Sequence, residues 1–317
     1  MRYKKIGDMD VSVIAVGTWA IGASNWGDVD KDESIRAIHA MIDNGVNLID
    51  TAPVYGFGHS EEVVGEAIKG KRDQVFLATK FGSTWPNGPD APRVRDNSRE
   101  NCFREVEDSL RRLGTDVIDL YIVHWPDFDR GDEQFAESMG ALEDLKKQGK
   151  IRHIGLSNHD QHMIEECMKY GTVDAIQPPY SMVNRRDEDL MKWAVSQGIG
   201  TMTYGSLGAG ILTGAIRELP HWDPKDTRYT FYDYFVEPKF SKVMALLKVL
   251  DEVAASHNVP VAQVAVNWST QQDYVTTALM GVRNPREANE NCAAMQWELS
   301  QDEIDLITKA IDENVGK

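Results

Sequence analysis

Short apolar runs alternate with amphipathic stretches along the whole chain. Most of the runs are apolar throughout, which is typical of strands buried on both faces of a parallel sheet. The eight runs span residues 13–17, 47–50, 75–80, 117–124, 151–157, 174–177, 198–204 and 275–281. Most of the amphipathic stretches open with acidic or hydroxyl residues and close on glycine, as helices do. They span residues 32–45, 60–70, 98–114, 133–150, 160–171, 187–198 and 239–258, with Ser60 as the expected N-cap of the second.

The alternation predicts eight strand–helix units, and the seven stretches between the eight runs supply the crossovers of a dozen or more residues that parallel strands need. Eight such units favour an α/β fold of the closed (β/α)8 TIM barrel type, with residues 1–317 as a single domain. A doubly wound open sheet is the alternative. Two additions are predicted. One is an N-terminal β-hairpin over residues 1–12 with Gly-Asp-Met-Asp as its turn, and the other is a long loop after strand 7 over residues 214–239.

Composition limits the classes of binding partner and the cellular compartment that are expected. Lys and Arg number 34 against 50 Asp and Glu, so the net charge is −16, and neither nucleic acid nor an anionic membrane is expected as a partner because both need a basic face. Cys102, Cys167 and Cys292 are too few and too scattered for a disulfide framework. No signal peptide or membrane span is recognisable, so a cytoplasmic protein is expected. The histidines and acids lack metal-ligand spacing, so no metal is expected and metal-dependent hydrolysis is disfavoured.

Four polar groups follow neighbouring strands of the predicted barrel. Asp50, Lys80 and His124 end the second, third and fourth runs, and Tyr55 lies in the loop after the second. Each alone has an ordinary explanation as an ion pair, a hydrogen-bonded residue or a packed loop residue. In a barrel, however, the carboxyl ends of the strands form one mouth, so all four side chains are expected to converge there.

Such a set suits proton transfer to a carbonyl oxygen as a hydride arrives, or the reverse reaction. A tyrosine has an ordinary pKa of ~10, and a nearby ammonium favours the ionised form. A carboxylate keeps that ammonium charged and oriented, and an imidazole can hold the substrate oxygen in place. No serine or cysteine is paired with a base, so nucleophilic catalysis is not indicated.

The motifs around these groups resemble those of the aldo-keto reductases, in particular the bacterial general-purpose type. The segments are "NLIDTAPVYGFGHSEEVVGEAI", "FLATKFG" and "DVIDLYIVHWPD", and the resemblance covers the whole chain. It implies a catalytic tetrad with Tyr55 as general acid/base, Lys80 and Asp50 as the pair that tunes it, and His124 as the group that positions the substrate.

The same resemblance implies a nicotinamide dinucleotide, carried by "GLSNH", "AIQPPYSMVNR", "TYGSLGAGILTG" and "MGVRNPREANENCAA". The implied contacts are Ser157, Asn158, Gln177, Tyr204, Ser206, Leu207, Gly210, Arg283, Arg286, Glu290 and Asn291. Arg283 makes NADP(H) the preferred cofactor, although Glu287 would disfavour a 2′-phosphate and keeps NAD(H) possible. Ala209 replaces an arginine common in the family. A Rossmann loop is not indicated, because Glu61 stands at the third glycine position of G-x-G-x-x-G.

The substrate side of the mouth is expected to be aromatic. Trp19, Trp26, Trp85 and Trp125 follow the first, third and fourth runs and are candidates to line a pocket. The loop 83–95 and the segment 214–239 are candidates for a lid. Polar residues of these loops could hold sugar hydroxyls or an acid group: Arg93, Arg95, His221 and Arg228. A sugar, a small aldehyde, a ketone and a steroid-like alcohol all remain possible substrates.

Two functions from different classes follow. The first is an NAD(P)(H)-dependent oxidoreductase acting on a carbonyl/alcohol pair. The alternative is a cofactor-binding regulatory or interaction subunit with little turnover, and the intact tetrad favours the enzyme. The acidic, mixed surface fits a monomer or a weak homo-oligomer.

Overall fold

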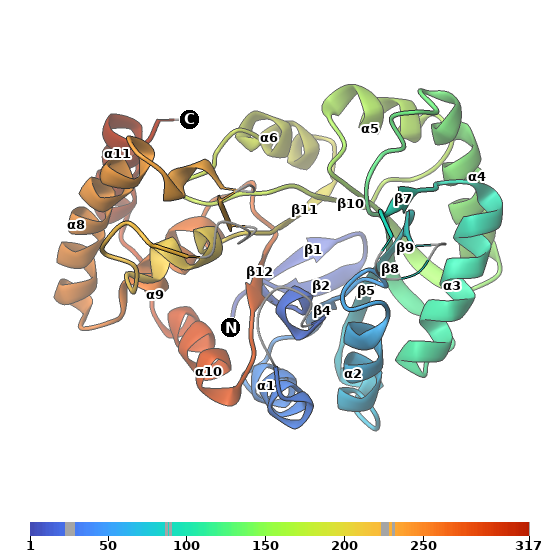
Figure 1. Ribbon diagram of the computed structural model, residues 1–317, viewed down its shortest axis with the longest axis horizontal. Coiled ribbons are helices and arrows are strands. Elements are labelled where there is room, and N and C mark those ends of the chain that lie inside the picture. The colour runs from blue at the N-terminus through green and yellow to red at the C-terminus, as the bar shows by residue number, and fades with distance from the viewer. Residues whose placement is uncertain (23–28, 86–87, 89–90, 223–227, 230–231, 317) are drawn as a thin grey trace.

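Eight parallel strands close into a barrel surrounded by helices (Figure 1). The computed structural model describes residues 1–22, 29–85, 88, 91–222, 228–229 and 232–316. Around the barrel the strands run in the order β10-β11-β12-β3-β4-β5-β8-β9. Their bounds are β3 Ile14–Gly17, β4 Leu48–Asp50, β5 Phe76–Phe81, β8 Ile118–Val123, β9 Ile151–Ser157, β10 Ala175–Gln177, β11 Gly200–Thr203 and β12 Thr277–Gly281. All eight predicted strands are confirmed, and the open-sheet alternative is wrong because the sheet closes.

The strands are apolar throughout because they are buried on both faces. Side chains such as Leu48, Ala78 and Leu120 fill the inside of the barrel. Their neighbours along the same strands, such as Ile49 and Leu77, pack outward against the helices. Successive strand residues point to opposite faces, so a strand with two buried faces carries no polar alternation.

The helices form the outer layer in Figure 1. They are α1 Lys31–Asp43, α2 His59–Ala67, α3 Arg99–Leu113, α4 Glu133–Lys147, α5 Gln161–Met168, α6 Glu188–Ser196, α8 Lys239–His257, α9 Val261–Thr270, α10 Pro285–Ala293 and α11 Gln301–Asn314. The predicted N-cap of α2 is wrong: Gly58 caps it, and Ser60 lies inside the helix. The Ser60 hydroxyl is buried and donates to Thr18 Oγ1 at 2.7 Å, so it joins α2 to the end of β3 instead of capping.

The predicted N-terminal hairpin is present and closes the floor of the barrel. β1 (Tyr3–Ile6) pairs antiparallel with β2 (Met9–Ser12), and Figure 1 shows the hairpin lying across the centre of the barrel. Its apolar residues join the core inside the barrel. The turn is shorter than predicted, because Met9 and Asp10 pair with β1 and only Gly7 and Asp8 remain between the strands.

Two predicted loops contain short regular elements. In the loop 83–95, β6 (Ser83–Thr84) pairs antiparallel with β7 (Val94–Arg95). The described part of 214–239 includes the 3-10 helix η4 (Asp233–Phe235), whose residues Tyr234 and Phe235 are buried in a cluster with α8 and α9. Elsewhere the described residues form the 3-10 helices η1 Trp19–Gly22, η2 Arg72–Gln74, η3 Gly208–Thr213 and η5 Ala294–Gln296.

Candidate active site

The structure brings Asp50, Tyr55, Lys80 and His124 together at the mouth of the barrel, as predicted. Asp50 is the last residue of β4, Lys80 lies in β5, and His124 follows β8 directly. β4 pairs with β5 and β5 pairs with β8, so the three side chains come from neighbouring strands. Tyr55 lies in the turn between β4 and α2.

Lys80 is the centre of the cluster. Its Nζ donates to Asp50 Oδ1 at 2.9 Å and Oδ2 at 2.7 Å, and to the Thr51 carbonyl at 2.8 Å. It also lies 3.3 Å from the Tyr55 hydroxyl oxygen. Asp50 and Lys80 are buried, and Gln177 Nε2 donates to Asp50 Oδ1 at 2.8 Å. The ammonium therefore has a fixed carboxylate on one side and the phenol on the other.

Burial and charge set the protonation states of the cluster. Burial raises the pKa of Tyr55 and outweighs the ammonium of Lys80, which lowers it. The lowering effect of the ammonium is as predicted, but the net shift is upward, so the phenol stays protonated at neutral pH. Burial lowers the pKa of Lys80, but Asp50 and Tyr55 offset this and leave that pKa raised.

His124 is a neutral imidazole beside the phenol. Burial, followed by the charges of Lys80 and Arg93, holds the pKa of His124 well below its ordinary value. Its ring lies edge-on to that of Tyr55, with the ring centroids 6.0 Å apart. The backbone is fixed from two sides: His124 N donates to the Phe81 carbonyl at 2.9 Å, and Asn158 Nδ2 donates to the His124 carbonyl at 2.9 Å.

The residues implied for the nicotinamide are linked to the cluster. Asn158 lies after β9 with a left-handed φ of 61°, and its Oδ1 accepts from the Tyr204 hydroxyl at 2.9 Å. Ser157 Oγ donates to the Gln177 carbonyl at 3.0 Å. Ser157, Asn158, Gln177 and Tyr204 thus form one edge of the mouth. Because Gln177 also donates a hydrogen bond to Asp50, this edge is joined to the cluster around Lys80.

The loop after β11 suits the close approach of a dinucleotide. Gly205 and Gly210 have left-handed φ values of 71° and 96°, and a Cβ built on either meets nothing within 4 Å. Ser206 and Leu207 occupy the turn that leads into η3. Open backbone of this kind can present N–H groups to a pyrophosphate. The donor set therefore fits the implied cofactor.

The residues implied for the adenosine end are paired with acids. Arg283 Nη2 lies 2.7 Å from Glu287 Oε1, and Arg283 N donates to Glu287 Oε2 at 2.9 Å. Arg286 Nε lies 3.5 Å from Glu290 Oε1. Asn291 Nδ2 donates to the Gly281 carbonyl at 3.4 Å, at the end of β12. Both arginines follow the end of β12 in sequence, and each already has a carboxylate partner.

The sequence profile of the Aldo/keto reductase family matches residues 13–312. The chain belongs to the aldo/keto reductase family. The aldo-keto reductase YhdN of Bacillus subtilis (strain 168) is 41% identical over 97% of this chain and 93% of its own length. The NADH-specific methylglyoxal reductase of Escherichia coli (strain K12) is 35% identical over 95% and 94%.

Solved structures agree with this assignment. A glycerol dehydrogenase from Gluconobacter oxydans superposes with a TM-score of 0.90 at 35% identity, over 99% of this chain and 96% of that one. An aldo/keto reductase from Klebsiella pneumoniae, solved with NADP and acetate, superposes with a TM-score of 0.74 at 27% identity over 99% and 95%. This aldo/keto reductase is therefore an NAD(P)(H)-dependent oxidoreductase that interconverts carbonyl compounds and alcohols.

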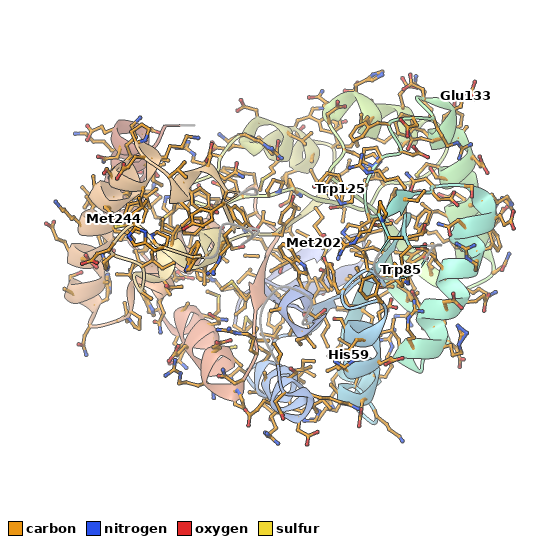
Figure 2. The ribbon with its side chains drawn as sticks, viewed as in Figure 1. His59, Trp85, Trp125, Glu133, Met202 and Met244 are labelled. Carbon is orange, nitrogen blue, oxygen red and sulfur yellow. The ribbon has the colours of Figure 1, made fainter. Side chains whose placement is uncertain are left out.

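The tryptophans predicted to line the substrate pocket of this reductase have different neighbours. The Trp19 ring centroid lies 6.4 Å from that of Tyr55. Trp85 packs on Phe57 with the centroids 5.2 Å apart. Trp125 lines a cavity of about 350 Å³ with Asn158 and other residues after β9 and β10. Trp85 and Trp125 lie on the same side of the barrel in Figure 2. Trp26 lies outside the described residues.

Sequence reasoning missed two buried amides that connect the loops carrying the site. Asn97 Nδ2 donates to the Trp125 carbonyl at 2.9 Å and to Gln134 Oε1 at 3.1 Å. Gln134 Nε2 donates in turn to the Asp127 carbonyl at 2.7 Å. The loop after β5 is thereby tied to the loop after β8, next to His124. Neither residue ends an apolar run, so the strand pattern gave no signal for them.

Proposed function

We propose that Tyr55 is the general acid/base of this enzyme, in the reduction of small aldehydes, ketones or sugars and the reverse oxidation. Lys80 and Asp50 form the pair that tunes the phenol, and His124 positions the substrate oxygen. The observation that carries the proposal is the Lys80 ammonium, which lies within hydrogen-bond distance of both the Asp50 carboxylate and the Tyr55 hydroxyl. A lone tyrosine gives neither a fixed orientation nor a counter-charge for its phenolate.

The bound nicotinamide supplies or accepts the hydride. During reduction the neutral imidazole of His124 donates its N–H to the carbonyl oxygen, which fixes the carbonyl against Tyr55. The phenol gives its proton to that oxygen as negative charge develops there, and Lys80 stabilises the phenolate left behind. Asp50 keeps the ammonium in place. The oxidation runs through the same groups in reverse, with Tyr55 accepting the proton of the alcohol.

We further propose that the cofactor is held by Ser157, Asn158, Gln177 and Tyr204 at its nicotinamide end and by the loop Ser206–Gly210 along its phosphates. At the adenosine end the candidates are Arg283, Arg286, Glu290 and Asn291. The arginines support a preference for NADP(H). The contact between Arg283 and Glu287 weakens that preference and leaves NAD(H) usable. An Escherichia coli relative is named NADH-specific, and the Klebsiella pneumoniae structure holds NADP.

We propose a single-domain cytoplasmic enzyme, monomeric or weakly associated, whose partners are its cofactor and its small-molecule substrate. Among the described helices, none has both the length and the apolar character required to cross a bilayer. The excess of acidic residues supports the expectation that nucleic acid and anionic membranes are not partners.

The test is turnover of a panel of aldehydes, ketones and sugars with NADPH and with NADH, followed at the nicotinamide absorbance. Quenching of tryptophan fluorescence measures cofactor binding in the same samples. We expect both binding and turnover. Tight cofactor binding without turnover of any compound would instead support the regulatory or interaction subunit.

A further inference from the structure

A buried carboxylate outside the catalytic cluster is joined to His124 through a single peptide group. The peptide bond between Phe81 and Gly82 lies at the end of β5, and its carbonyl oxygen accepts from His124 N at 2.9 Å. The N–H of the same peptide donates to Glu105 Oε2 at 3.1 Å. Glu105 lies in α3 and is buried. Because a peptide group is rigid and planar, a shift at its N–H also moves the carbonyl that holds His124.

The second carboxylate oxygen of Glu105 also accepts a hydrogen bond. Asn101, one turn earlier in α3, donates from Nδ2 to Glu105 Oε1 at 3.1 Å and to the Asp96 carbonyl at 2.6 Å. Asp96 N donates in turn to the Gly82 carbonyl at 3.2 Å. Gly82 is closely enclosed, since its φ is 90° and a Cβ placed on it would lie 2.0 Å from Asn97 Oδ1. Both oxygens of Glu105 are therefore acceptors, a pattern that an ionised carboxylate satisfies in full.

The Glu105 carboxylate has neutral hydrogen-bond donors and no bonded cation. Within the described part of the chain its hydrogen-bond partners are Gly82 N and Asn101 Nδ2, and no ion pair includes it. By contrast, the neighbouring acid Glu61 of α2 is paired with Arg112, with Nε 2.6 Å from Oε2. A buried carboxylate without a cation is costly to ionise, because burial penalises the charged form.

The surroundings of Glu105 bring its protonation into the neutral range. Burial raises the pKa of Glu105 to about 7, against the hydrogen bonds from Asn101 and Gly82, which lower it. Burial also raises the pKa values of the nearby thiol and phenol, so both are neutral near pH 7. The ionisable groups that interact with the Glu105 charge are Cys102 and Arg104 of α3, Glu61 of α2 and Tyr121 of β8.

We propose that Glu105 is a positioning residue: its carboxylate holds the peptide group at the end of β5, and that peptide holds His124 against the substrate oxygen. The inference rests on the proposed function, because it needs His124 to bind the carbonyl oxygen. A proton on either oxygen of Glu105 turns an acceptor into a donor that opposes an N–H donor. Protonation of Glu105 therefore loosens the peptide and slows carbonyl reduction.

The pH profile of kcat/KM tests this, because the reacting groups do not titrate near pH 7. The pKa of Tyr55 is raised above its ordinary value of ~10, and the pKa of His124 lies well below its ordinary value of ~6.5. At saturating cofactor, we expect wild-type kcat/KM for carbonyl reduction to fall about tenfold as the pH is lowered from about 8 to about 6, since a misplaced catalytic group costs up to ~100-fold.

Glu105→Gln keeps the size of the side chain and removes its charge. It should lower kcat/KM about tenfold at pH 8 and abolish the pH dependence near pH 7, with cofactor affinity unchanged in tryptophan fluorescence titrations. Asn101→Ala should move the midpoint of the profile to higher pH, because the hydrogen bond from Asn101 lowers the pKa of Glu105. Glu107→Gln is the matched control, since it removes a carboxylate from the exposed face of the same helix, where Glu107 pairs with Lys150.

The control should keep the wild-type rate and the wild-type pH profile. A lower melting temperature of Glu105→Gln with an unchanged pH profile would overturn the proposal, because it would make Glu105 purely structural. A constant wild-type kcat/KM over the same pH range would also overturn it. If Glu105→Gln does not fold, the wild-type profile and its displacement in Asn101→Ala decide the question. Absence of wild-type turnover with every carbonyl compound would count against the proposed function itself.

Discussion

Both ends of the barrel contain a buried carboxylate held by a basic side chain. At the mouth, Asp50 is paired with Lys80, and both are almost fully buried. At the floor, Asp119 is fully buried and is paired with Arg72 and Arg152, with Arg72 Nη2 at 2.7 Å from Oδ2 and Arg152 Nη1 at 2.9 Å from Oδ1. Strand β5 connects the two ends, since Lys80 lies near its end and Leu77 N donates to Asp119 Oδ2 at 2.8 Å.

The two ends differ in what the cation does with its remaining donors. Arg72 donates to the backbone carbonyls of Val75 and Val117 at 2.8 and 2.9 Å, so every partner at the floor is structural. Lys80 reaches the phenol of Tyr55, a group that can exchange a proton with a ligand. The comparison teaches that, in the proposed mechanism, a buried ion pair takes part in catalysis through the titratable group that it also contacts.

The largest expected effect comes from Lys80→Met at the mouth. Removal of the ammonium should lower kcat/KM for carbonyl reduction by about 1000-fold, because the phenolate loses its counter-charge. The variant should also unfold more easily, since Asp50 is left buried without its cation. The double variant Asp50→Asn/Lys80→Met should regain much of the stability but none of the rate, as measured by thermal melting and steady-state kinetics. Recovery of the rate in the double variant would show that Lys80 acts through folding alone.

The matched change at the floor is Arg72→Met. It should lower the free energy of unfolding by about 2 kcal/mol, because it leaves Asp119 and two backbone carbonyls with fewer donors. The kcat/KM of the folded enzyme should stay within about twofold of wild type, since no floor residue contacts the reacting groups. Urea unfolding and steady-state kinetics measure the two quantities. If Arg72→Met lost as much kcat/KM as Lys80→Met, the floor could not be called structural and the mouth catalytic.

The floor should also respond to pH through His153. The Asp174 carboxylate, with Oδ1 3.3 Å from His153 Nδ1, raises the pKa of His153 against the effect of burial, and Asp8 adds to the rise. Lys146 is a basic group beside this pair, with its Nζ 3.9 Å from Asp174 Oδ2. Because the pKa is raised on folding, the stabilisation is complete below the unfolded-state pKa of ~6.5 and is lost as the pH rises through the folded-state value.

We therefore expect the free energy of unfolding to fall by about 1 kcal/mol as the pH rises through that range. His153→Gln should remove this part of the pH dependence and leave the pH profile of kcat/KM unchanged. Urea unfolding at a series of pH values measures it. An identical pH dependence in wild type and His153→Gln would contradict the assignment.

The smallest expected effect is on cofactor choice. Glu287→Gln removes the carboxylate that holds Arg283 and should raise the ratio of kcat/KM for NADPH to that for NADH by about fivefold, since the guanidinium is freed for a 2′-phosphate. Glu313→Gln is the matched control, since it removes a carboxylate from an exposed pair with Lys309 on α11, away from the cofactor candidates. An unchanged ratio in Glu287→Gln would mean that Arg283 does not reach the cofactor.

The sequence was sufficient for the strands and for the convergence of the four polar groups at the mouth, because both follow from local pattern. A strand buried on two faces is recognisable from its own residues, and strands that run parallel bring the residues near their carboxyl ends, such as Asp50 and Lys80, to one edge. Helix α9 was not predicted, because its mostly apolar sequence lacks both a polar face and a capping residue. The contact of Asn97 with Trp125 depends on how two loops pack, and the pattern of apolar and polar residues does not predict it.

The overall direction of the pKa shift of Tyr55 could not be predicted from the sequence either. The sequence shows that an ammonium could lie near the phenol, which lowers the pKa. How deeply the phenol is buried, which raises the pKa and prevails, depends on the folded loops around it.

The most direct test of the account is Tyr55→Phe, which removes one hydroxyl and keeps the ring. We predict a loss of at least about 100-fold in kcat for carbonyl reduction, with cofactor affinity unchanged in tryptophan fluorescence titrations. Turnover near the wild-type rate with cofactor bound would contradict the assignment of Tyr55 as the proton donor.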